Sequence, residues 1–387
     1  MLLVCGARPD FMKAAPLYRA MRATDTLDPV LIHTGRHFDS AISEDFIAAL
    51  ELPEPDVHLG IGQGSQAWQL AEIIKGMEKA LLEVRPWLTV VVGDVSSTLA
   101  AALASATLDI PVAHVEAGLR SRDETMPEER NRMLVDRLAT YLFTPSADAD
   151  ENLSAEGIPA SRVFNVGNVM IDSLDWVLPR LSAAATRARF GVAAGRYGLV
   201  TLHRPANVDH PGALRRLIGA LAEVADDLPL LFPMHPRARR RIHELGVDLD
   251  DTGIKALPPV GYTDFVALLA GASLVLTDSG GIQEEATVLR VPCLTLRDNT
   301  ERPVTILYGG NELVGRDPER IVTAARRRLR APSMETGRPP GWDGRAAQRI
   351  VDVLAAAAPG TTVETAPTRG GGTHDASDRP PPARMLR

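Results

Sequence analysis

The chain has 387 residues, of which 45% are hydrophobic, and it carries a formal net charge of −7. This length suits two domains that each bury a core of their own. The acidic balance gives no broad basic surface, so we expect no nucleic-acid partner. No apolar run is long enough for a signal peptide or a membrane span. The two cysteines, Cys5 and Cys293, stand in apolar strand-like runs, as reduced core residues do. We therefore expect a soluble, cytoplasmic protein without membrane contact.

Short β-branched runs alternate along the chain with longer Ala- and Leu-rich helical patterns, which is typical of βαβ units and parallel sheets. In the first half the predicted strands lie near residues 2–5, 30–34, 88–92, 111–115 and 141–144. The predicted helices of this half lie near residues 11–23, 40–50, 65–84, 97–107 and 129–139. The fold class is therefore α/β.

The second half repeats this alternation. Its predicted strands lie near residues 163–166, 198–202, 229–233, 254–257, 273–277 and 291–296. Its predicted helices lie near residues 170–182, 211–226, 263–271, 281–288 and 317–330. Neither half has a GxGxxG motif after its first strand, which argues against a nicotinamide-binding domain. The last part, 358–387, is rich in Pro, Gly and Thr and predicts a disordered tail.

The most informative stretch is 277–303, with the sequence TDSGGIQEEATVLRVPCLTLRDNTERP. Ser279, Gly280 and Gly281 stand between a predicted strand and a predicted helix. The free N–H groups and the positive dipole end of such a helix start point at one spot and suit a phosphate. The two glycines let the backbone approach a ligand closely because no Cβ intervenes.

Two charged residues of the same stretch strengthen this interpretation. Glu285 lies one turn into the helix, where a carboxylate suits the hydroxyls of a ribose. Arg302 follows the next strand and offers a forked donor for phosphate. A lone Ser-Gly-Gly is more often only a tight turn, but these neighbours favour a diphosphonucleoside site.

Several carboxylates follow strands of the first half, at the sheet edge where open α/β sheets bind ligands. Asp94 ends one apolar strand, and Glu116 comes directly after the next strand. Asp94 could also be a simple turn or helix-cap residue. Glu128 and Glu129 could be first-turn acids of a helix, where negative charge is favoured. Glu116 has no such local explanation.

Two histidines occupy comparable positions in the second half. His203 and His235 each follow a predicted strand, although a lone histidine is more often structural than catalytic. The nearby arginines at 237 and 239–241 are best interpreted as a solvated helix face. No motif for a metal site is present in the sequence.

At this point the motifs resemble those of the bacterial non-hydrolysing UDP-N-acetylglucosamine 2-epimerases. They run in the same order over about residues 1–330: GARPDFMKAAPL, TGRHFD, VVGDVSSTLAAALAS, AHVEAGLRSRDETMPEERNRMLVDRL, NVGNVMIDSL, TLHRPANVD and the 277–303 stretch. The resemblance implies a GT-B architecture, with two Rossmann-like domains, 1–166 and 167–343, facing across a cleft. It also implies that a helix near 344–357 crosses back onto the first domain, and that the enzyme is a homodimer.

The resemblance assigns a role to each matching residue. It implies acid/base carboxylates at Asp94, Glu116 and Glu128, with His203 completing the catalytic set. It implies substrate contacts from Arg8, Lys13, Arg132, His235, Ser279, Gly280, Gly281, Glu285 and Arg302. No cofactor and no metal are implied.

The reaction that the resemblance implies eliminates UDP to a 2-acetamidoglucal and adds UDP back after C2 has inverted. The C2 proton leaves from one face and returns to the other, so at least two acid/base groups are needed. Four alternatives stay open: a hydrolysing epimerase that releases N-acetylmannosamine, an epimerase acting on a modified sugar, a GT-B glycosyltransferase, and a non-catalytic UDP-sugar-binding protein.

Overall fold

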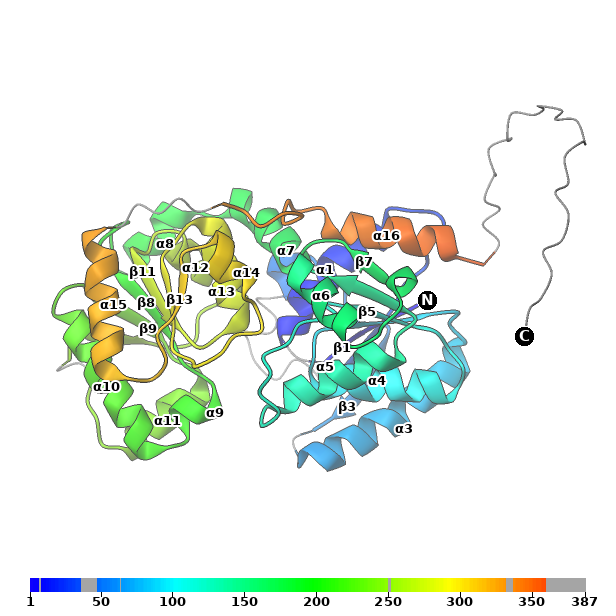
Figure 1. Cartoon of the computed structure of the whole chain (residues 1–387), viewed down its shortest axis with the longest axis horizontal. Helices are drawn as coiled ribbons and strands as arrows, with labels where there is room; N and C mark the ends of the chain where they lie inside the picture. The colour runs from blue at the N-terminus through cyan, green and yellow to red at the C-terminus, as the bar shows by residue number, and fades with distance from the viewer. Residues whose placement is uncertain (7, 36–46, 63, 250–251, 332–336, 360–387) are drawn as a thin grey trace, which may run out of the picture.

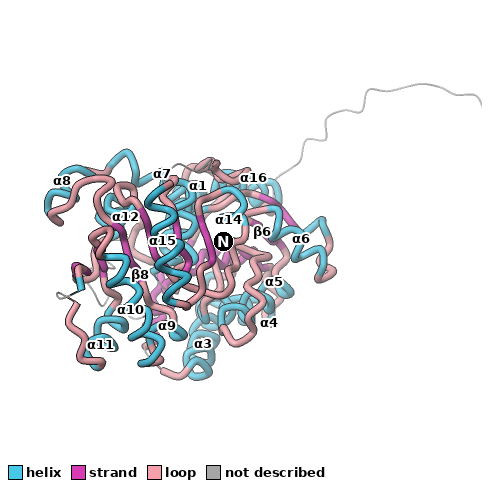
Figure 2. The backbone as a smooth tube through the Cα atoms, turned by 60° about the vertical axis from the view of Figure 1, so that its left-hand side comes forward, coloured by secondary structure: helices cyan, strands magenta, loops and turns pink. Residues whose placement is uncertain are grey.

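The computed structural model of this chain describes residues 1–6, 8–35, 47–62, 64–249, 252–331 and 337–359. Two parallel β-sheets lie side by side along the long axis of the molecule (Figure 1). Helices enclose the strands of both sheets, as the view coloured by secondary structure shows (Figure 2). The predicted α/β class with two parallel sheets is confirmed.

The first sheet has the strand order β3-β2-β1-β4-β5-β6-β7, with every neighbouring pair parallel. Six of its strands in this order are those of a doubly wound, Rossmann-like sheet. The strands are β1 (Leu2–Cys5), β2 (Val30–Gly35), β3 (Val57–Ile61), β4 (Thr89–Val92), β5 (Val112–Val115), β6 (Tyr141–Thr144) and β7 (Val163–Asn165). The helices are α1 (Arg8–Arg22), α3 (Gln66–Val84), α4 (Ser96–Thr107), α5 (Pro127–Leu138) and α6 (Ala147–Ala155). The central strands are buried throughout because helices cover both faces.

The second sheet has the strand order β10-β9-β8-β11-β12-β13 and is also parallel. Its strands are β8 (Gly198–Thr201), β9 (Leu230–Pro233), β10 (Ile254–Leu257), β11 (Leu274–Thr277), β12 (Cys293–Thr295) and β13 (Asn311–Leu313). Its helices are α8 (Ala183–Arg189), α9 (Pro205–Val208), α10 (Pro211–Ala225), α11 (Pro236–Glu244), α12 (Tyr262–Leu269), α13 (Gly280–Leu289), α14 (Val304–Tyr308) and α15 (Pro318–Arg330).

Two helices, α7 and α16, lie where the two halves of the chain meet. Helix α7 (Val169–Val177) packs against both α1 and α13 and so lies between the two sheets. Helix α16 (Ala346–Ala357) packs against α1 and α7 (Figure 1). The indole of Trp342, which precedes α16, donates to the carbonyl of Pro145 over 2.8 Å. We infer that α16 belongs structurally to the first domain.

The structure also contains elements that sequence patterns missed. Strand β3 is a half-exposed edge strand with the sequence VHLGI, whose polar and glycine residues weaken the strand signal. Strand β13 has only the three residues Asn-Glu-Leu, too few for a periodicity. Most of the helix expected near 40–50 lies outside the described residues. Residues 360–387 of the tail expected at 358–387 also lie outside them. None of the helices in the described part of the chain combines the length and the apolar character needed to cross a bilayer.

Asp172 on α7 tests the attachment of α16. Its two carboxylate oxygens accept from the N–H groups of Ala346 (3.1 Å) and Ala347 (2.7 Å), which have no acceptor inside α16. Replacing Asp172→Ala should lower the free energy of unfolding in urea by about 1–2 kcal/mol, the usual cost of losing a helix cap.

The matched control is Asp175→Ala on the same helix. Asp175 pairs with Arg338 at the surface (2.7 Å), where an ion pair contributes about 0–1 kcal/mol. Equal losses for the two variants would contradict the anchoring role of Asp172.

Candidate active site

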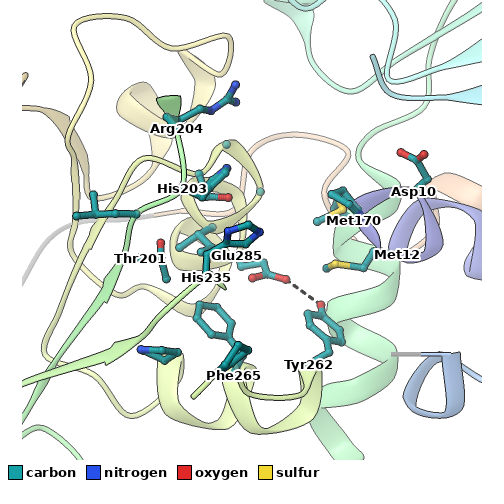
Figure 3. Close-up of a pocket in the computed structure, with 18 of the residues that line it drawn as sticks. Asp10, Met12, Met170, Thr201, His203, Arg204, His235, Tyr262, Phe265 and Glu285 are labelled. Atoms are coloured by element: carbon teal, nitrogen blue, oxygen red, sulfur yellow. Dashed lines mark hydrogen bonds between the residues drawn. The ribbon is translucent and has the colours of Figure 1, made fainter. Parts of the chain in front are cut away.

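A cavity of about 690 Å³ lies between the two domains. Residues that follow strands of both sheets line it, because both sheets direct the carboxyl ends of central strands toward the cleft. Figure 3 shows second-domain side chains such as His203, His235 and Glu285 facing Met12 and Met170 across it. This arrangement is the predicted GT-B architecture.

The Ser-Gly-Gly segment forms one wall of the cavity. Ser279 is the N-cap residue of α13, and Gly280 and Gly281 are its first helical residues. Their N–H groups have no acceptor inside the helix, so they remain available to an anion. A Cβ on Gly280 would lie 2.7 Å from Glu301 Oε1 and closer still to Arg302 Nη1. The glycine is therefore required by the close approach of these two side chains.

Glu285 lies one turn further along α13 and faces the same cavity. Tyr262 Oη donates a hydrogen bond to Glu285 Oε1 over 2.8 Å, drawn as the dashed line in Figure 3. Burial raises the pKa of Glu285 to about 7, although the hydrogen bond from Tyr262 opposes the shift. The tyrosine leaves the other carboxylate oxygen to a ligand hydroxyl.

Arg302 is at the centre of a buried ion cluster. Its guanidinium contacts Glu116 (2.6 Å), Glu284 (2.7 Å) and Glu301 (2.5 Å). Burial alone would lower the pKa of Arg302, but the three carboxylates outweigh burial and raise it above the usual value. Glu116 comes from the first domain and the other members from the second, so this cluster spans the cleft.

Glu116 lies behind two cations. Besides Arg302 it pairs with Lys13 of α1, and both cations line the cavity, whereas Glu116 is set back from it. Its backbone has a φ of 74°, in the left-handed region that a non-glycine residue rarely adopts. The fold thus accepts backbone strain to turn this carboxylate toward Lys13 and Arg302.

Asp94 follows β4 and lines the cavity directly. Arg132 of α5 contacts it over 2.5 Å and also pairs with Glu129. Burial alone would raise the pKa of Asp94, but the positive charges of Arg132 and Lys13 outweigh burial and lower the pKa. Asp94 is therefore an ionised carboxylate at the cavity wall.

Glu128 and Glu129, adjacent at the start of α5, have different tasks. Glu129 is buried and accepts from the N–H groups of Ser121 (2.9 Å) and Arg122 (2.8 Å), so it fixes the preceding loop. Glu128 lines the cavity, and Arg204 of the second domain approaches it to 3.6 Å. Only Glu128 is placed to meet a ligand.

His203 follows β8 and lines the cavity, with its Nδ1 2.9 Å from Asp278 Oδ1. Asp278 is fully buried and also accepts from the N–H groups of His203 and Arg204 and from the amide of Asn207. Burial alone would raise the pKa of Asp278, but His203 and these donors lower it. The His235 ring lies 6.4 Å from the His203 ring, centroid to centroid.

Comparison with known proteins agrees with this geometry. A family model described as UDP-N-acetylglucosamine 2-epimerase matches residues 19–355. The chain belongs to the UDP-N-acetylglucosamine 2-epimerase family. The resemblance read from the sequence motifs is thereby confirmed.

Individual relatives within the epimerase family cover nearly the whole chain. The UDP-N-acetylglucosamine 2-epimerase of Methanocaldococcus jannaschii is 40% identical, over 91% of this chain and 98% of its own. The UDP-2,3-diacetamido-2,3-dideoxy-D-glucuronate 2-epimerase of Pseudomonas aeruginosa is 39% identical, over 92% and 99%.

Solved structures of the family are similar as well. The Methanocaldococcus jannaschii enzyme in complex with UDP-GlcNAc and UDP superposes with a TM-score of 0.84 at 40% identity, covering 91% of this chain and 98% of that one. The Neisseria meningitidis enzyme bound to UDP-GlcNAc has a TM-score of 0.85 at 30% identity, with the same coverage.

Most site residues expected for an epimerase meet in the one cavity. Those lining it are Lys13, Asp94, Glu128, His203, His235, Ser279, Gly280, Gly281, Glu285 and Arg302. Glu116 and Arg132 do not line the cavity but form ion pairs with residues that do, namely Arg302 and Asp94. Arg8 is the first residue of α1, but its side chain lies outside the described part of the structure. No group of three or more candidate metal ligands occurs within the described ranges.

Sequence reasoning did not single out three residues that fix side chains of the site: Asp278 holds His203, Tyr262 holds Glu285, and Glu301 holds Arg302. Asp278 carried a signal, because it ends a strand directly before Ser279. Tyr262 and Glu301 carried none that periodicity or strand ends reveal.

Removing the central cation tests the ion cluster. Arg302→Met removes the shared cation of three buried carboxylates, of which Glu284 has no second cation in the described structure, and should cost about 3–5 kcal/mol of unfolding free energy at pH 8. Such carboxylates have a raised pKa in the folded state, so the folded protein takes up protons as the pH falls. The stability deficit should therefore be smaller at pH 5 than at pH 8 in urea unfolding.

Arg326→Met is the control, because Arg326 pairs with Asp227 (2.8 Å) and Glu223 (3.0 Å) at the surface. It should change stability little at either pH. A deficit for Arg302→Met that grows on acidification would refute the buried-cluster interpretation.

Proposed function

We propose that this protein reversibly inverts C2 of UDP-N-acetylglucosamine, or of a close UDP-2-acetamido sugar, by eliminating UDP and adding it back. The observation that carries this proposal is that a single interdomain cavity joins the Ser279–Gly281 turn and Arg302 to the carboxylates Asp94 and Glu128. The Ser279–Gly281 turn with Arg302, the nucleotide cradle, alone fits many activities, whereas two carboxylates in the same cavity are what removal and return of a proton require.

The second domain binds the nucleotide. The first N–H groups of α13, Arg302 and Lys13 surround the diphosphate, and Glu285, oriented by Tyr262, accepts from the ribose hydroxyls. When the C1–O bond breaks, its electron pair stays on the β-phosphate oxygen. Positioned N–H donors and cations stabilise that charge in the transition state.

The first domain handles the C2 proton. Asp94 and Glu128 line the cavity from different elements, the β4 end and the start of α5, and we assign them to opposite faces of the bound sugar. One accepts the proton as the 2-acetamidoglucal forms, and the other delivers a proton to the opposite face when UDP returns. Glu116 acts through Lys13 and Arg302, whose positions it sets.

Contacts across the cleft favour the non-hydrolysing outcome. Arg302 reaches Glu116 (2.6 Å), Arg204 reaches Glu128 (3.6 Å) and Asn299 reaches Asp123 (3.4 Å). Contacts that hold the two domains together around the cavity favour keeping the glucal and UDP in one site. The hydrolysing alternative requires water to reach C1 while these contacts persist.

A modified sugar is the second candidate substrate. The relative from Pseudomonas aeruginosa, 39% identical, is named for a diacetamido-dideoxyglucuronate. Its identity to this chain is nearly that of the N-acetylglucosamine enzyme from Methanocaldococcus jannaschii, so overall similarity does not separate the two sugars.

Turnover in D2O tests the proposed function. UDP-N-acetylglucosamine and UDP-2,3-diacetamido-2,3-dideoxyglucuronate are incubated separately with the protein, without an acceptor, and followed by NMR. We expect one of them to give a stable mixture of C2 epimers with deuterium at C2. Steady accumulation of free N-acetylmannosamine and UDP would instead identify a hydrolysing enzyme. Binding without exchange would indicate a non-catalytic protein.

Two glycines provide a matched test of the cradle. In Gly280→Ala the added Cβ meets Arg302 and Glu301, so UDP should bind at least about tenfold more weakly, a loss of about 1.4 kcal/mol, in isothermal titration calorimetry. Gly219 of α10 has open space around its Cβ position, so Gly219→Ala should leave UDP affinity unchanged. If Gly280→Ala and Gly219→Ala bind UDP with equal affinity, UDP does not bind at the Ser279–Gly281 turn.

The homodimer and the cytoplasmic location stay predictions. Apolar side chains are exposed on α5 (Met133, Leu134) and on α3 (Trp68, Leu82), as on surfaces that a second copy covers. Sedimentation analysis of the full chain measures the oligomeric state.

A further inference from the structure

Asp278 belongs to the segment that forms the nucleotide cradle, yet its side chain turns away from the cavity. Strands β8 and β11 pair in parallel with Thr201 opposite Thr277. Two residues beyond each, His203 and Ser279 are therefore neighbours at the same sheet edge. The imidazole of His203 thus stands beside the turn that would hold the diphosphate.

The Asp278 carboxylate is enclosed by donors. Its oxygens accept from His203 N (3.1 Å), Arg204 N (2.9 Å) and Asn207 Nδ2 (3.0 Å), besides His203 Nδ1. These donors fix the carboxylate and keep it ionised in a fully buried site. An ionised carboxylate only accepts, so the proton it shares with His203 is on Nδ1.

The imidazole has a second nitrogen, Nε2, on the side of the ring away from Asp278. The His203 side chain is 40% exposed and lines the cavity, so Nε2 is the nitrogen open to a substrate. The neighbouring His235 accepts from Arg237 N at its Nδ1 (3.2 Å), so that nitrogen carries no proton. Asp278 is the negative charge that directly contacts His203.

We propose that Asp278 is a positioning residue that holds His203 with a proton on Nδ1, so that an N–H at Nε2 is directed at the departing diphosphate. This inference rests on the proposed epimerase function. It adds to that function an oriented N–H donor for the leaving group.

The elimination breaks two bonds of the sugar, C1–O and C2–H. The C1–O bond breaks and its electron pair remains on the β-phosphate oxygen, while the C2 proton passes to a carboxylate of the first domain. A C1=C2 double bond forms, and Nε2–H hydrogen-bonds the charge that UDP gains. With the anionic diphosphate on one side and Asp278 on the other, each ring N–H faces a negatively charged acceptor. Re-addition of UDP reverses each event.

Asp278→Asn is the informative substitution. An amide keeps an oxygen for the backbone donors but presents an N–H₂ group to His203 Nδ1, which favours the opposite, neutral tautomer. Nε2 of that neutral ring keeps its proton but donates without positive charge, so we expect kcat for C2 exchange to fall by about tenfold with little change in KM. Asp317→Asn, which changes a carboxylate capping α15 away from the cavity, should leave kcat unchanged.

A spectroscopic test does not depend on activity. In ¹⁵N-histidine-labelled protein saturated with UDP, the His203 signals are assigned by their loss in His203→Gln. The wild type should show a protonated Nδ1, and Asp278→Asn an unprotonated Nδ1. If the wild type lacks C2 exchange with every UDP-sugar, the proposed function fails, but this measurement still decides what Asp278 does to His203.

The double variant separates positioning from mere folding support. If Asp278 acts through His203, Asp278→Asn combined with His203→Gln should be no slower than His203→Gln alone. A purely structural role predicts losses that multiply. Multiplied losses, or an Asp278→Asn protein with wild-type kcat and Nδ1 protonation, would overturn the proposal.

Discussion

The architecture of this site depends on one buried cation, Arg302. Three carboxylates converge on it, and two of them have a second cation of their own: Lys13 pairs with Glu116, and Arg297 with Glu301. The six charges cancel, which is the condition under which buried ions are tolerated. Because Glu116 comes from the first domain, the same balance that makes the cluster stable also joins the domains.

This charge balance has a consequence for an anionic substrate. A diphosphate placed on Lys13 and Arg302 adds negative charge to a cluster that is already neutral. Glu284 is the member that burial and the neighbouring Glu116 most disfavour as an anion, and its pKa is raised. Proton uptake at such a carboxylate restores neutrality, so nucleotide binding and protonation are coupled in this geometry. The raised pKa of Glu284 thus links the protonation of the cluster to the binding of an anion in the cavity.

Much of the site was predictable because strand ends are visible in sequence. Asp94, His203 and Ser279 each follow an apolar run, and parallel sheets bring the ends of central strands to one edge. Periodicity also distinguishes helix from strand in most of the longer elements, although helix α6 (Ala147–Ala155) was not predicted. The short edge strands β3 and β13 escaped because three to five residues with polar members give too weak a pattern.

What sequence patterns could not predict is the direction of individual side chains. Glu284 and Glu285 are adjacent in sequence, but consecutive helical residues point about 100° apart. One therefore contacts Arg302 and the other Tyr262. The same holds for Glu128 and Glu129, of which only the first reaches the cavity. Glu116 likewise has a left-handed backbone, and sequence patterns predicted neither this conformation nor its pairing with Lys13 and Arg302.

The contacts of Arg302 and His203 also suggest why UDP can serve as leaving group and nucleophile in one closed site. Both residues stand beside the first turn of α13, and each is held by a carboxylate that does not line the cavity: Glu116 for Arg302, and Asp278 for His203. Donors fixed in this way need no rearrangement when charge moves onto the β-phosphate or leaves it. The same contacts therefore stabilise the charge on the β-phosphate oxygen both in the elimination and in the re-addition, so one set of donors serves both halves of a C2 inversion.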